Sequence, residues 1–531
     1  MKFERSSGIL LHPTSLSGSY GIGDLGPQAY KWIDFLAQAG CSLWQVLPLG
    51  PTGFGDSPYQ CFSAFAGNPY LISPQILLDE GLLHPDDLVE IPNFPTNCVD
   101  YGAVINWKLN VLDQAYIRFQ HSQDNNLLLE FDQFCHAQAN WLEDFALFMS
   151  IKEASSGAPW STWNPDIRDR ISDTLEEARE EYTTAINRQM FRQFLFYRQW
   201  DSLHKYANGL GIKIIGDIPI FVAHDSADVW ADPQLFHLDE NGQPSVVAGV
   251  PPDYFSPTGQ LWGNPLYRWD IHAEDGYSWW LKRLRAVLKQ VDIIRLDHFR
   301  GFAGYWEVPG DAETAIDGRW VNGPGVHFFD QVLSELGDLP IIAEDLGVIT
   351  PDVIEMRDRY GLPGMKILQF SFEGGPDDPF LPHNFVPNCV VYTGTHDNDT
   401  ASGWYARVDS DARDFYRRYV GRDGRNVSWD LIRASWASVA IFAIAPYQDF
   451  LSLGNEARMN YPGNASGNWS WRMSNSALDE SILNGIYEFN YLYNRMNPVT
   501  KQRQEDQKRK AEMVSETDWL EGEVVESLEE E

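Results

Sequence analysis

The chain has 531 residues, 44% of them hydrophobic and 22% charged, a composition typical of a globular protein with a large core. Acidic residues outnumber basic ones by 75 to 40, and the formal charge of −35 argues against nucleic acid or an anionic membrane surface as the main partner. The five cysteines are scattered without a CxxC pair, so neither a disulfide framework nor a zinc ribbon is indicated, and a reducing compartment is expected.

The start of the chain enters an apolar strand almost directly, which leaves no room for the apolar core of a secretory signal. The sequence also has no run of 18 apolar residues of the kind that spans a membrane. We therefore expect a cytoplasmic protein. The alternative is a protein from which a transit peptide has been removed. Length alone allows two to four domains or one barrel with large insertions.

The chain opens with a strand, a helix and a second strand, the order typical of a parallel sheet. The strands are predicted at Gly8 to Leu16 and Leu43 to Gly50, and the helix at Tyr30 to Ala39. A loop rich in glycine, proline and aromatic residues follows, from Gly50 to Ser73, and loops of this length are often functional. Tyr59 on this loop is a candidate substrate contact, although it could equally fasten the loop to the body.

Residues 75–206 interrupt the alternation of strands and helices. From Asp86 to Tyr206 apolar and aromatic side chains recur at helical spacing, as in the stripe Val104, Trp107 and Val111. This pattern predicts an inserted, largely helical subdomain whose aromatic side chains fill its own core.

A third strand is predicted at Ile212 to Phe221 and carries Asp217, and a second insertion follows at residues 225–267. Its prolines and glycines, such as Pro251, Pro252 and Gly259, argue against regular structure. Aromatic side chains on an exposed irregular loop suggest a lid over a ligand. The candidate ligand contacts of this lid are Tyr254, Phe255 and Trp262.

The apolar, β-branched run from Val291 to Leu296 is typical of a strand buried on both faces of a parallel sheet. It leads into Arg295, Asp297 and His298, charged or titratable groups that are costly to bury unless they meet a partner or a substrate. An ion pair between Arg295 and Asp297 that merely closes the strand is the alternative.

Further strands are predicted at Leu339 to Gly347, Met365 to Phe372, Cys389 to Thr400 and Ile441 to Leu451. Eight strands alternating with helices predict an α/β fold, a (β/α)₈ TIM barrel with inserted, largely helical subdomains and long active-site loops. Four carboxylates fall at or just past the carboxyl ends of the strands, the face on which barrel enzymes act: Asp217, Asp297, Glu344 and Asp397.

Motifs for common cofactors are missing from the sequence. It contains no GxGxxG, no Walker loop and no HExxH, so a bound dinucleotide, a nucleoside triphosphate or a peptidase zinc ion is not supported. His298 and His396 stand beside carboxylates and could ligate a metal, but metal sites usually show closer pairing. We therefore predict neither a cofactor nor a metal.

The segments RLDHFRG, AEDLG and THDND, in that order and preceded by GDIPIFV, resemble the catalytic blocks of the α-amylase superfamily. The loops LHPTSL, DSPYQCFSAFAGNPYL, VAGVPPDYFSPTGQLWGNP and NYPGNASGNWSWR narrow this resemblance to the 4-α-glucanotransferases, also called amylomaltases or disproportionating enzymes. The resemblance covers residues 8–497. We expect residues 1–497 to form a single catalytic barrel. The charged segment 498–531 lies outside it, and its composition predicts a frayed helix or a flexible, disordered tail.

The resemblance implies a nucleophile, an acid/base and a third carboxylate that grips sugar hydroxyls, at Asp297, Glu344 and Asp397 respectively. Retaining transfer needs two carboxyls about 5 to 5.5 Å apart, a spacing that the ends of adjacent strands can meet. Burial and neighbouring carboxylates should raise the pKa of Glu344, while Arg295 should keep Asp297 charged. Substrate-binding roles are expected for Tyr59, Asp217, Tyr254, Phe255, Trp262, Arg295, His298, His396 and Asn464.

The implied reaction moves a segment of a 1,4-α-glucan to the 4-hydroxyl of glucose or another glucan, through a covalent glycosyl-aspartate. Its substrates would be starch, glycogen and maltooligosaccharides, and we expect a monomer or weak homodimer. An α-glucan hydrolase of the same superfamily and a non-catalytic glucan-binding protein are the alternatives. The intact carboxylates argue against the binding protein, and the transferase loops argue against the hydrolase.

Overall fold

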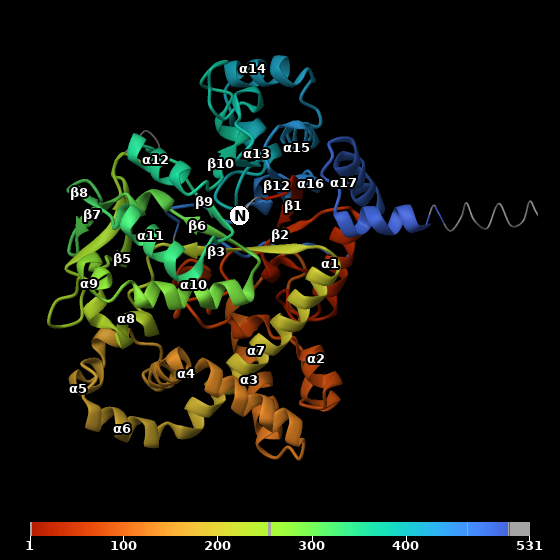
Figure 1. The fold of residues 1–531 in the computed structure, drawn as a ribbon. Helices are drawn as coiled ribbons and strands as arrows, with labels where there is room; N and C mark the ends of the chain where they lie inside the picture. The colour runs from red at the N-terminus through yellow and green to blue at the C-terminus, as the bar shows by residue number, and fades with distance from the viewer. Residues whose placement is uncertain (1–2, 253–255, 465, 508, 510–531) are drawn as a thin grey trace, which may run out of the picture.

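The computed structural model describes residues 3–252, 256–464, 466–507 and 509. A closed barrel of eight parallel strands forms its centre (Figure 1). Around the barrel the strands follow the order β1 (Ser6–Leu10), β12 (Phe442–Pro446), β11 (Cys389–Tyr392), β10 (Gly364–Ile367), β9 (Ile341–Ala343), β6 (Ile293–Asp297), β3 (Lys213–Pro219) and β2 (Leu43–Gln45). Each strand overlaps its predicted range, so the predicted (β/α)₈ barrel is confirmed.

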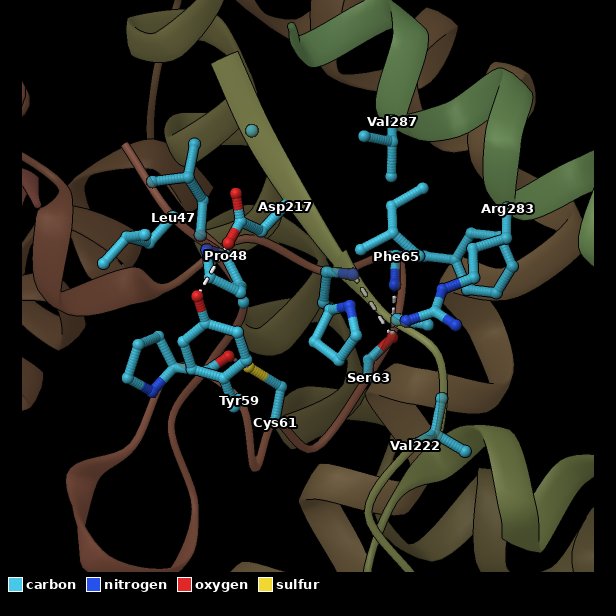
Figure 2. A pocket seen from close by; sticks show the side chains of 18 of the residues that line it. Leu47, Pro48, Tyr59, Cys61, Ser63, Phe65, Asp217, Val222, Arg283 and Val287 are labelled. Carbon is cyan, nitrogen blue, oxygen red and sulfur yellow. Dashed lines mark hydrogen bonds between the residues drawn. The ribbon is translucent and has the colours of Figure 1, made fainter. Parts of the chain in front are cut away.

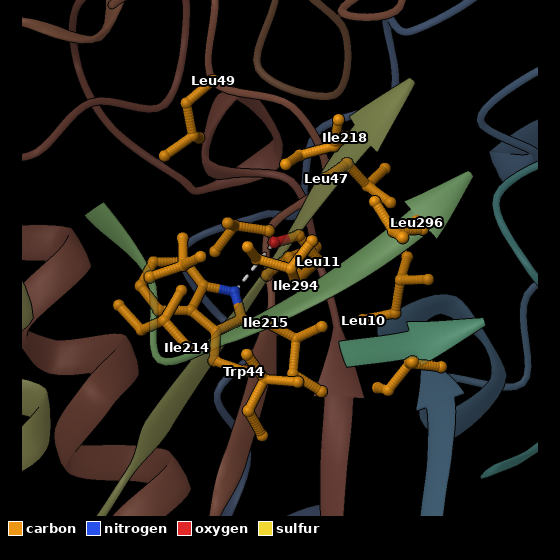
Figure 3. Packing of buried hydrophobic residues seen from close by; sticks show 14 of the residues in the cluster. Leu10, Leu11, Trp44, Leu47, Leu49, Ile214, Ile215, Ile218, Ile294 and Leu296 are labelled. Atoms are coloured by element: carbon orange, nitrogen blue, oxygen red, sulfur yellow. Dashed lines mark hydrogen bonds between the residues drawn. The ribbon is translucent and has the colours of Figure 1, made fainter. Parts of the chain in front are cut away.

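The strands are buried on both faces, as their continuous apolar runs predicted. Leu10, Trp44, Ile214 and Ile294 come from four different strands and pack together in the core (Figure 3). The indole nitrogen of Trp44 donates a hydrogen bond of 2.8 Å to the carbonyl of Leu11, so this large side chain is buried with its polar atom paired.

Helices surround the barrel on its outer side (Figure 1). Helix α10, for example, contacts both β3 and β6 and so covers the strands that carry Asp217 and Asp297. The helices outside the insertions are α1 (Pro27–Gln38), α10 (Ser278–Gln290), α11 (Gly325–Leu336), α12 (Pro351–Arg359), α13 (Ala401–Arg407), α14 (Ser410–Val420), α15 (Val427–Ala437), α16 (Tyr447–Phe450) and α17 (Glu480–Leu492).

Helices also make up most of residues 74–209, which lie together on one side of the barrel (Figure 1). Aromatic rings join them, and the rings of Phe119 and Phe191 stack at 4.5 Å. The helices are α2 (Pro74–Asp79), α3 (Tyr101–Gln120), α4 (Asn125–Ala154), α5 (Pro165–Arg168), α6 (Ser172–Glu181) and α7 (Thr183–Gly209).

A second sheet lies beside the barrel, and it corrects the expectation that residues 225–267 lack regular structure. Its antiparallel strands run in the order β5 (Gln260–Pro265), β4 (Val246–Val250), β7 (Gly304–Pro309) and β8 (Arg319–Asn322). Helices α8 (Ala227–Ala231) and α9 (Trp269–Glu274) flank the first two strands. Strand β4 pairs with β5, the next strand in the chain, and with β7, which lies past β6, so local sequence could not reveal the second pairing.

Of the segment predicted as a frayed helix or flexible tail from residue 498, the structure describes the first part, which is a helix. Residues 498–507 are helical and hydrogen-bond to the body. The hydroxyl of Thr500 donates to the carbonyl of Ala37 at 2.8 Å, and that of Tyr487 donates to Gln504 at 3.0 Å. The buried side chain of Asn497 accepts a hydrogen bond from the Val499 amide, which starts this helix. In the part of the chain that the structure describes, no helix is both long and apolar enough to cross a bilayer.

Removing the helical segment should therefore lower stability. We expect truncation after Asn497 to reduce the melting temperature by several degrees, because it deletes contacts worth about 1 kcal/mol per hydrogen bond. Truncation after Arg509 removes only the strongly acidic end and should leave the melting temperature nearly unchanged. Calorimetry of the two truncated proteins checks this, and equal melting temperatures would contradict it.

Candidate active site

The carboxyl ends of β3, β6 and β9 bring the candidate carboxylates together. Asp217 on β3 pairs in register with Arg295 on β6. Leu296 pairs in the same way with Ala343, so the residues that follow, Asp297 and Glu344, stand beside each other at the mouth of the barrel. This is the face on which barrel enzymes place their chemistry.

Arg295 is the centre of a charged network inside the barrel. Its guanidinium donates to Asp217 at 2.7 Å and to Asp297 at 2.7 Å, and to the hydroxyl of Tyr59 at 3.1 Å. Tyr59 in turn donates to Asp217 at 2.7 Å. The side chain of Arg295 is 3% exposed and that of Asp217 0%, whereas 29% of Asp297 remains exposed. Asp297 is therefore the carboxylate of this network that a substrate can reach, and Asp217 stands behind it.

Glu344 is held by backbone amides on both of its oxygens. The amide of His298 donates to it at 2.7 Å and that of Leu346 at 3.2 Å. His298 has a φ of +51°, a left-handed conformation that is uncommon outside glycine. This turn directly after Asp297 aims the amide of His298 at Glu344, so the two carboxylates are fixed relative to each other.

The surroundings of Asp297 and Glu344 affect the pKa values of the two carboxyl groups differently. Burial raises the pKa of Glu344 well above its usual value, and the neighbouring Asp297 raises it further. Burial also raises the pKa of Asp297, but the Arg295 guanidinium in direct contact opposes the rise. Asp297 therefore loses its proton first and Glu344 keeps one, a pairing that suits a nucleophile and an acid.

Asp397 lies opposite, in the loop after β11, with 46% of its side chain exposed. His396 contacts it at 3.3 Å, and the amide group of Asn460 donates to it at 2.6 Å. Although the surrounding protein removes part of its hydration, His396 and these hydrogen bonds outweigh that effect and lower the pKa of Asp397 to about 2. Asp397 is therefore a charged hydrogen-bond acceptor across the working pH range.

Asn460 was missed by the sequence analysis, which named Asn464 in the same segment. Asn464 is exposed, and its backbone closes the turn through hydrogen bonds with Tyr461 and Asn468. The sequence contains no local sign that Asn460 faces Asp397, because 63 residues separate the two.

Aromatic rings pack around the same mouth; Tyr59 and Trp262 are partly exposed there, whereas His396 and Trp469 are buried. Tyr59 stacks on His396 at 5.0 Å, and both rings contact Trp469, which the sequence analysis did not name, at 5.7 and 5.5 Å. On the other side, Trp262 on β5 meets the ring of His298 edge-on at 4.8 Å. The other two candidate lid residues, Tyr254 and Phe255, lie outside the described residues.

A cavity of about 70 Å³ lies behind Tyr59 and Asp217, between the barrel and α10 (Figure 2). This space holds a few water molecules and is far smaller than a typical ligand pocket of about 300–1,000 Å³. Cys61 lines it, and burial raises the pKa of its thiol to about 12, so this thiol stays protonated. Within the described ranges, no group of three or more His, Cys, Asp or Glu is placed to hold a metal ion.

Comparison with known proteins gives the family. A family model described as 4-alpha-glucanotransferase matches residues 11–478. The 4-alpha-glucanotransferase of Thermus thermophilus is 51% identical over 89% of this chain and 95% of its own, and that of Synechocystis is 50% identical over 93% and 98%. The chain belongs to the 4-alpha-glucanotransferase family. The amylomaltase of Streptococcus agalactiae, solved in complex with acarbose, has a TM-score of 0.90 at 40% identity and covers 93% of this chain and 100% of its own.

Family membership confirms the resemblance drawn from the catalytic blocks and loops. The chain is an enzyme that transfers a segment of a 1,4-α-glucan to an acceptor, in the metabolism of starch and maltooligosaccharides. Its matched region includes all three candidate catalytic carboxylates and ends before the tail.

The Arg295 network leads to a prediction about pH. Arg295→Lys should reduce kcat/KM about 10- to 100-fold. The ammonium of lysine cannot replace the planar guanidinium, whose hydrogen bonds to charged groups contribute about 1.5–3 kcal/mol each. The role expected for Asp297 requires its ionised form, and Arg295 restrains its pKa, so weakening that contact should raise the pKa. The acid side of the pH–activity profile should then move to higher pH.

Arg495→Lys is the matched control for this variant. Arg495 is equally buried, but it hydrogen-bonds backbone carbonyls at the opposite end of the barrel, including those of Ser6 and Ala440. Its replacement should lower the melting temperature without moving the pH profile. An acid limb that stays in place in Arg295→Lys would show that Arg295 does not set the charge of Asp297.

Proposed function

We propose that the transfer proceeds by double displacement, with Asp297 as the nucleophile and Glu344 as the acid/base. The observation that carries this proposal is the pairing at the ends of β6 and β9: a carboxylate in contact with Arg295 beside a carboxyl whose pKa lies well above its usual value. Retaining glycosidases use such a pair, with the two carboxyls about 5 to 5.5 Å apart.

In the first step Asp297 attacks the anomeric carbon of the donor glucan and forms a covalent glycosyl ester. The bond to the leaving glycosidic oxygen breaks, and Glu344 gives that oxygen its proton. In the second step Glu344 takes the proton of the acceptor 4-hydroxyl, whose oxygen attacks the same carbon and releases Asp297. One glycosidic bond is broken and one is made, so the number of reducing ends does not change.

Asp397 and the rings around it act on the sugar. Asp397 is ionised and partly exposed, which suits an acceptor for sugar hydroxyls that binds more strongly as positive charge develops on the ring. Tyr59, which stacks on the buried ring of His396, and Trp262 are partly exposed and form apolar walls against which sugar rings can lie and from which water is excluded. These walls favour an acceptor glucan over water in the second step.

The substrates are maltooligosaccharides and longer 1,4-α-glucans as donors, with glucose or another glucan as acceptor. The similar Streptococcus agalactiae structure holds acarbose, which supports a cleft of this kind here. A monomer or weak homodimer and a cytoplasmic location stay predictions from the sequence. Hydrolysis by the same carboxylates is the second candidate, because water can replace the acceptor in the second step.

Maltotriose distinguishes transfer from hydrolysis. We expect glucose and maltooligosaccharides longer than maltotriose to appear together while the concentration of reducing ends stays nearly constant. Chromatography of the products, combined with a reducing-end assay on the same samples, measures both quantities. A steady rise in reducing ends would identify a hydrolase, and an unchanged maltotriose peak would identify a binding protein.

Asp297→Asn tests the nucleophile. The change is nearly isosteric and removes the attacking oxygen charge, so turnover of maltotriose should fall by at least a thousandfold while the protein stays folded. Asp292→Asn is the matched control, because Asp292 stands at the opposite end of the same strand and accepts hydrogen bonds from His204 and the Ile214 amide. That variant should lose stability and keep its turnover. Substantial activity in Asp297→Asn would place the nucleophile elsewhere.

The predicted lid is tested by replacing both Tyr254 and Phe255 with alanine. If these rings stack on acceptor sugars, each contributes about 0.5 to 1.5 kcal/mol beyond the area it buries. Transfer should then fall more than hydrolysis, and the ratio of hydrolysis to transfer should rise with little change in melting temperature. An unchanged ratio, or a large drop in melting temperature, would mark the two rings as structural.

A further inference from the structure

The loop that carries Asp397 is tied at both ends by one buried carboxylate. This loop, residues 393–401, joins β11 to α13 and is called the Asp397 loop below. The hydroxyl of Thr393 at its start donates to one oxygen of Asp449 at 2.5 Å. The backbone amide of Ala401 at its end donates to the other oxygen at 2.7 Å. Asp449 lies in α16, at the carboxyl end of β12, and is 0% exposed.

A carboxylate is suited to this position because it offers two acceptor oxygens and, when ionised, no donor. An asparagine would turn an N–H₂ group toward one of the two donors and would lose that contact. Among the described residues no cation pairs with Asp449. Burial raises its pKa to about 6, and the hydrogen bonds from Ala401 and Thr393 oppose that rise. These two hydrogen-bond donors therefore stabilise the buried carboxylate, as a neighbouring cation usually does.

Other contacts join the Asp397 loop to the residues that follow Asp449 in the chain. Asn455 accepts a hydrogen bond from the amide of Thr400 at 3.2 Å. Arg458 donates to the backbone carbonyl of Asp397 at 2.5 Å, and Asn460 donates to the Asp397 carboxylate itself. Within this group, Asp449 is the residue that contacts both ends of the loop. Outside it, Gln369 donates hydrogen bonds to the carbonyls of Thr393 and Asp399, so Asp449 and Gln369 together span the loop.

We propose that Asp449 is a positioning residue that fixes the place of the Asp397 carboxylate by binding both ends of the Asp397 loop. This inference rests on the role proposed above for Asp397. Asp449 touches no substrate, since it is fully buried beneath the loop. Its effect reaches the sugar only through Asp397, whose contact with the reacting ring has to be correct to a fraction of an ångström in the transition state.

The primary test is Asp449→Asn, with kcat and KM measured for maltotriose. Because Asp397 acts most strongly in the transition state, kcat should fall at least tenfold while KM changes less than about threefold. Thr393→Val removes one of the two donors and should give a smaller loss of the same kind, and Thr393→Ser keeps the hydroxyl and should restore the parent kcat. Asp292→Asn, at the other end of the barrel, again controls for general loss of stability.

A double-mutant cycle separates positioning from general damage. The variants Asp397→Asn, Asp449→Asn and their combination are compared with α-maltosyl fluoride as donor, whose good leaving group keeps low rates measurable. If Asp449 acts through Asp397, the combined variant should be no slower than Asp397→Asn alone. If Asp449→Asn does not fold, Thr393→Val takes its place in the cycle.

The outcomes distinguish this inference from the proposed function. Losses that multiply in the combined variant, or a kcat of Asp449→Asn within twofold of the parent, overturn the inference and leave the role of Asp397 intact. Near-parent activity of Asp397→Asn overturns the role of Asp397 and this inference with it. A parent-like kcat in Thr393→Val together with a low kcat in Thr393→Ser would also overturn it, because the hydroxyl would then not be the group that matters.

Discussion

The structure depends on the charge balance around Arg295 inside the barrel. A guanidinium that is 3% exposed is stable there only because Asp217 and Asp297 both contact it, and Tyr59 supplies a further oxygen. The two anions on one cation leave a net negative charge at the barrel mouth. That charge is next to Glu344 and helps to keep it protonated, so the proposed acid depends on the same interaction as the proposed nucleophile.

Sequence reasoning predicted the barrel strands and the carboxylates at their ends because both signals are local. An apolar run followed within a few residues by Asp297, or by Glu344, marks a strand and its carboxyl end at the same time. Asn460, Trp469 and Asp449 carry no such signal, since each meets its partners across 48 or more residues of chain. The pairing of β4 with β7 was not predicted for the same reason. The helix at residues 498–507 depends on its cap, Asn497, which is itself buried against the body.

Three carboxyl groups with similar pKa values in water differ in pKa here because each has different surroundings. A cation in contact favours the ionised form of Asp297, and burial beside an anion favours the protonated form of Glu344. Hydrogen bonds from His396 and Asn460 stabilise the anion at Asp397. Such separation lets groups of one chemical type supply a nucleophile, an acid and an electrostatic partner at one pH.

The parts of the site differ in how they are supported, and this difference bears on transfer. Asp297 and Glu344 stand on strands of a closed barrel, where register fixes their spacing. Asp397 stands on a loop and needs Asp449, Asn455 and Asn460 to hold it, and all three come from the segment that continues into Trp469. The buried ring of Trp469, which packs against Tyr59 and His396, and the Asp397 carboxylate are thus held by one connected segment. A change in that segment that moves Trp469 should therefore move Asp397 as well.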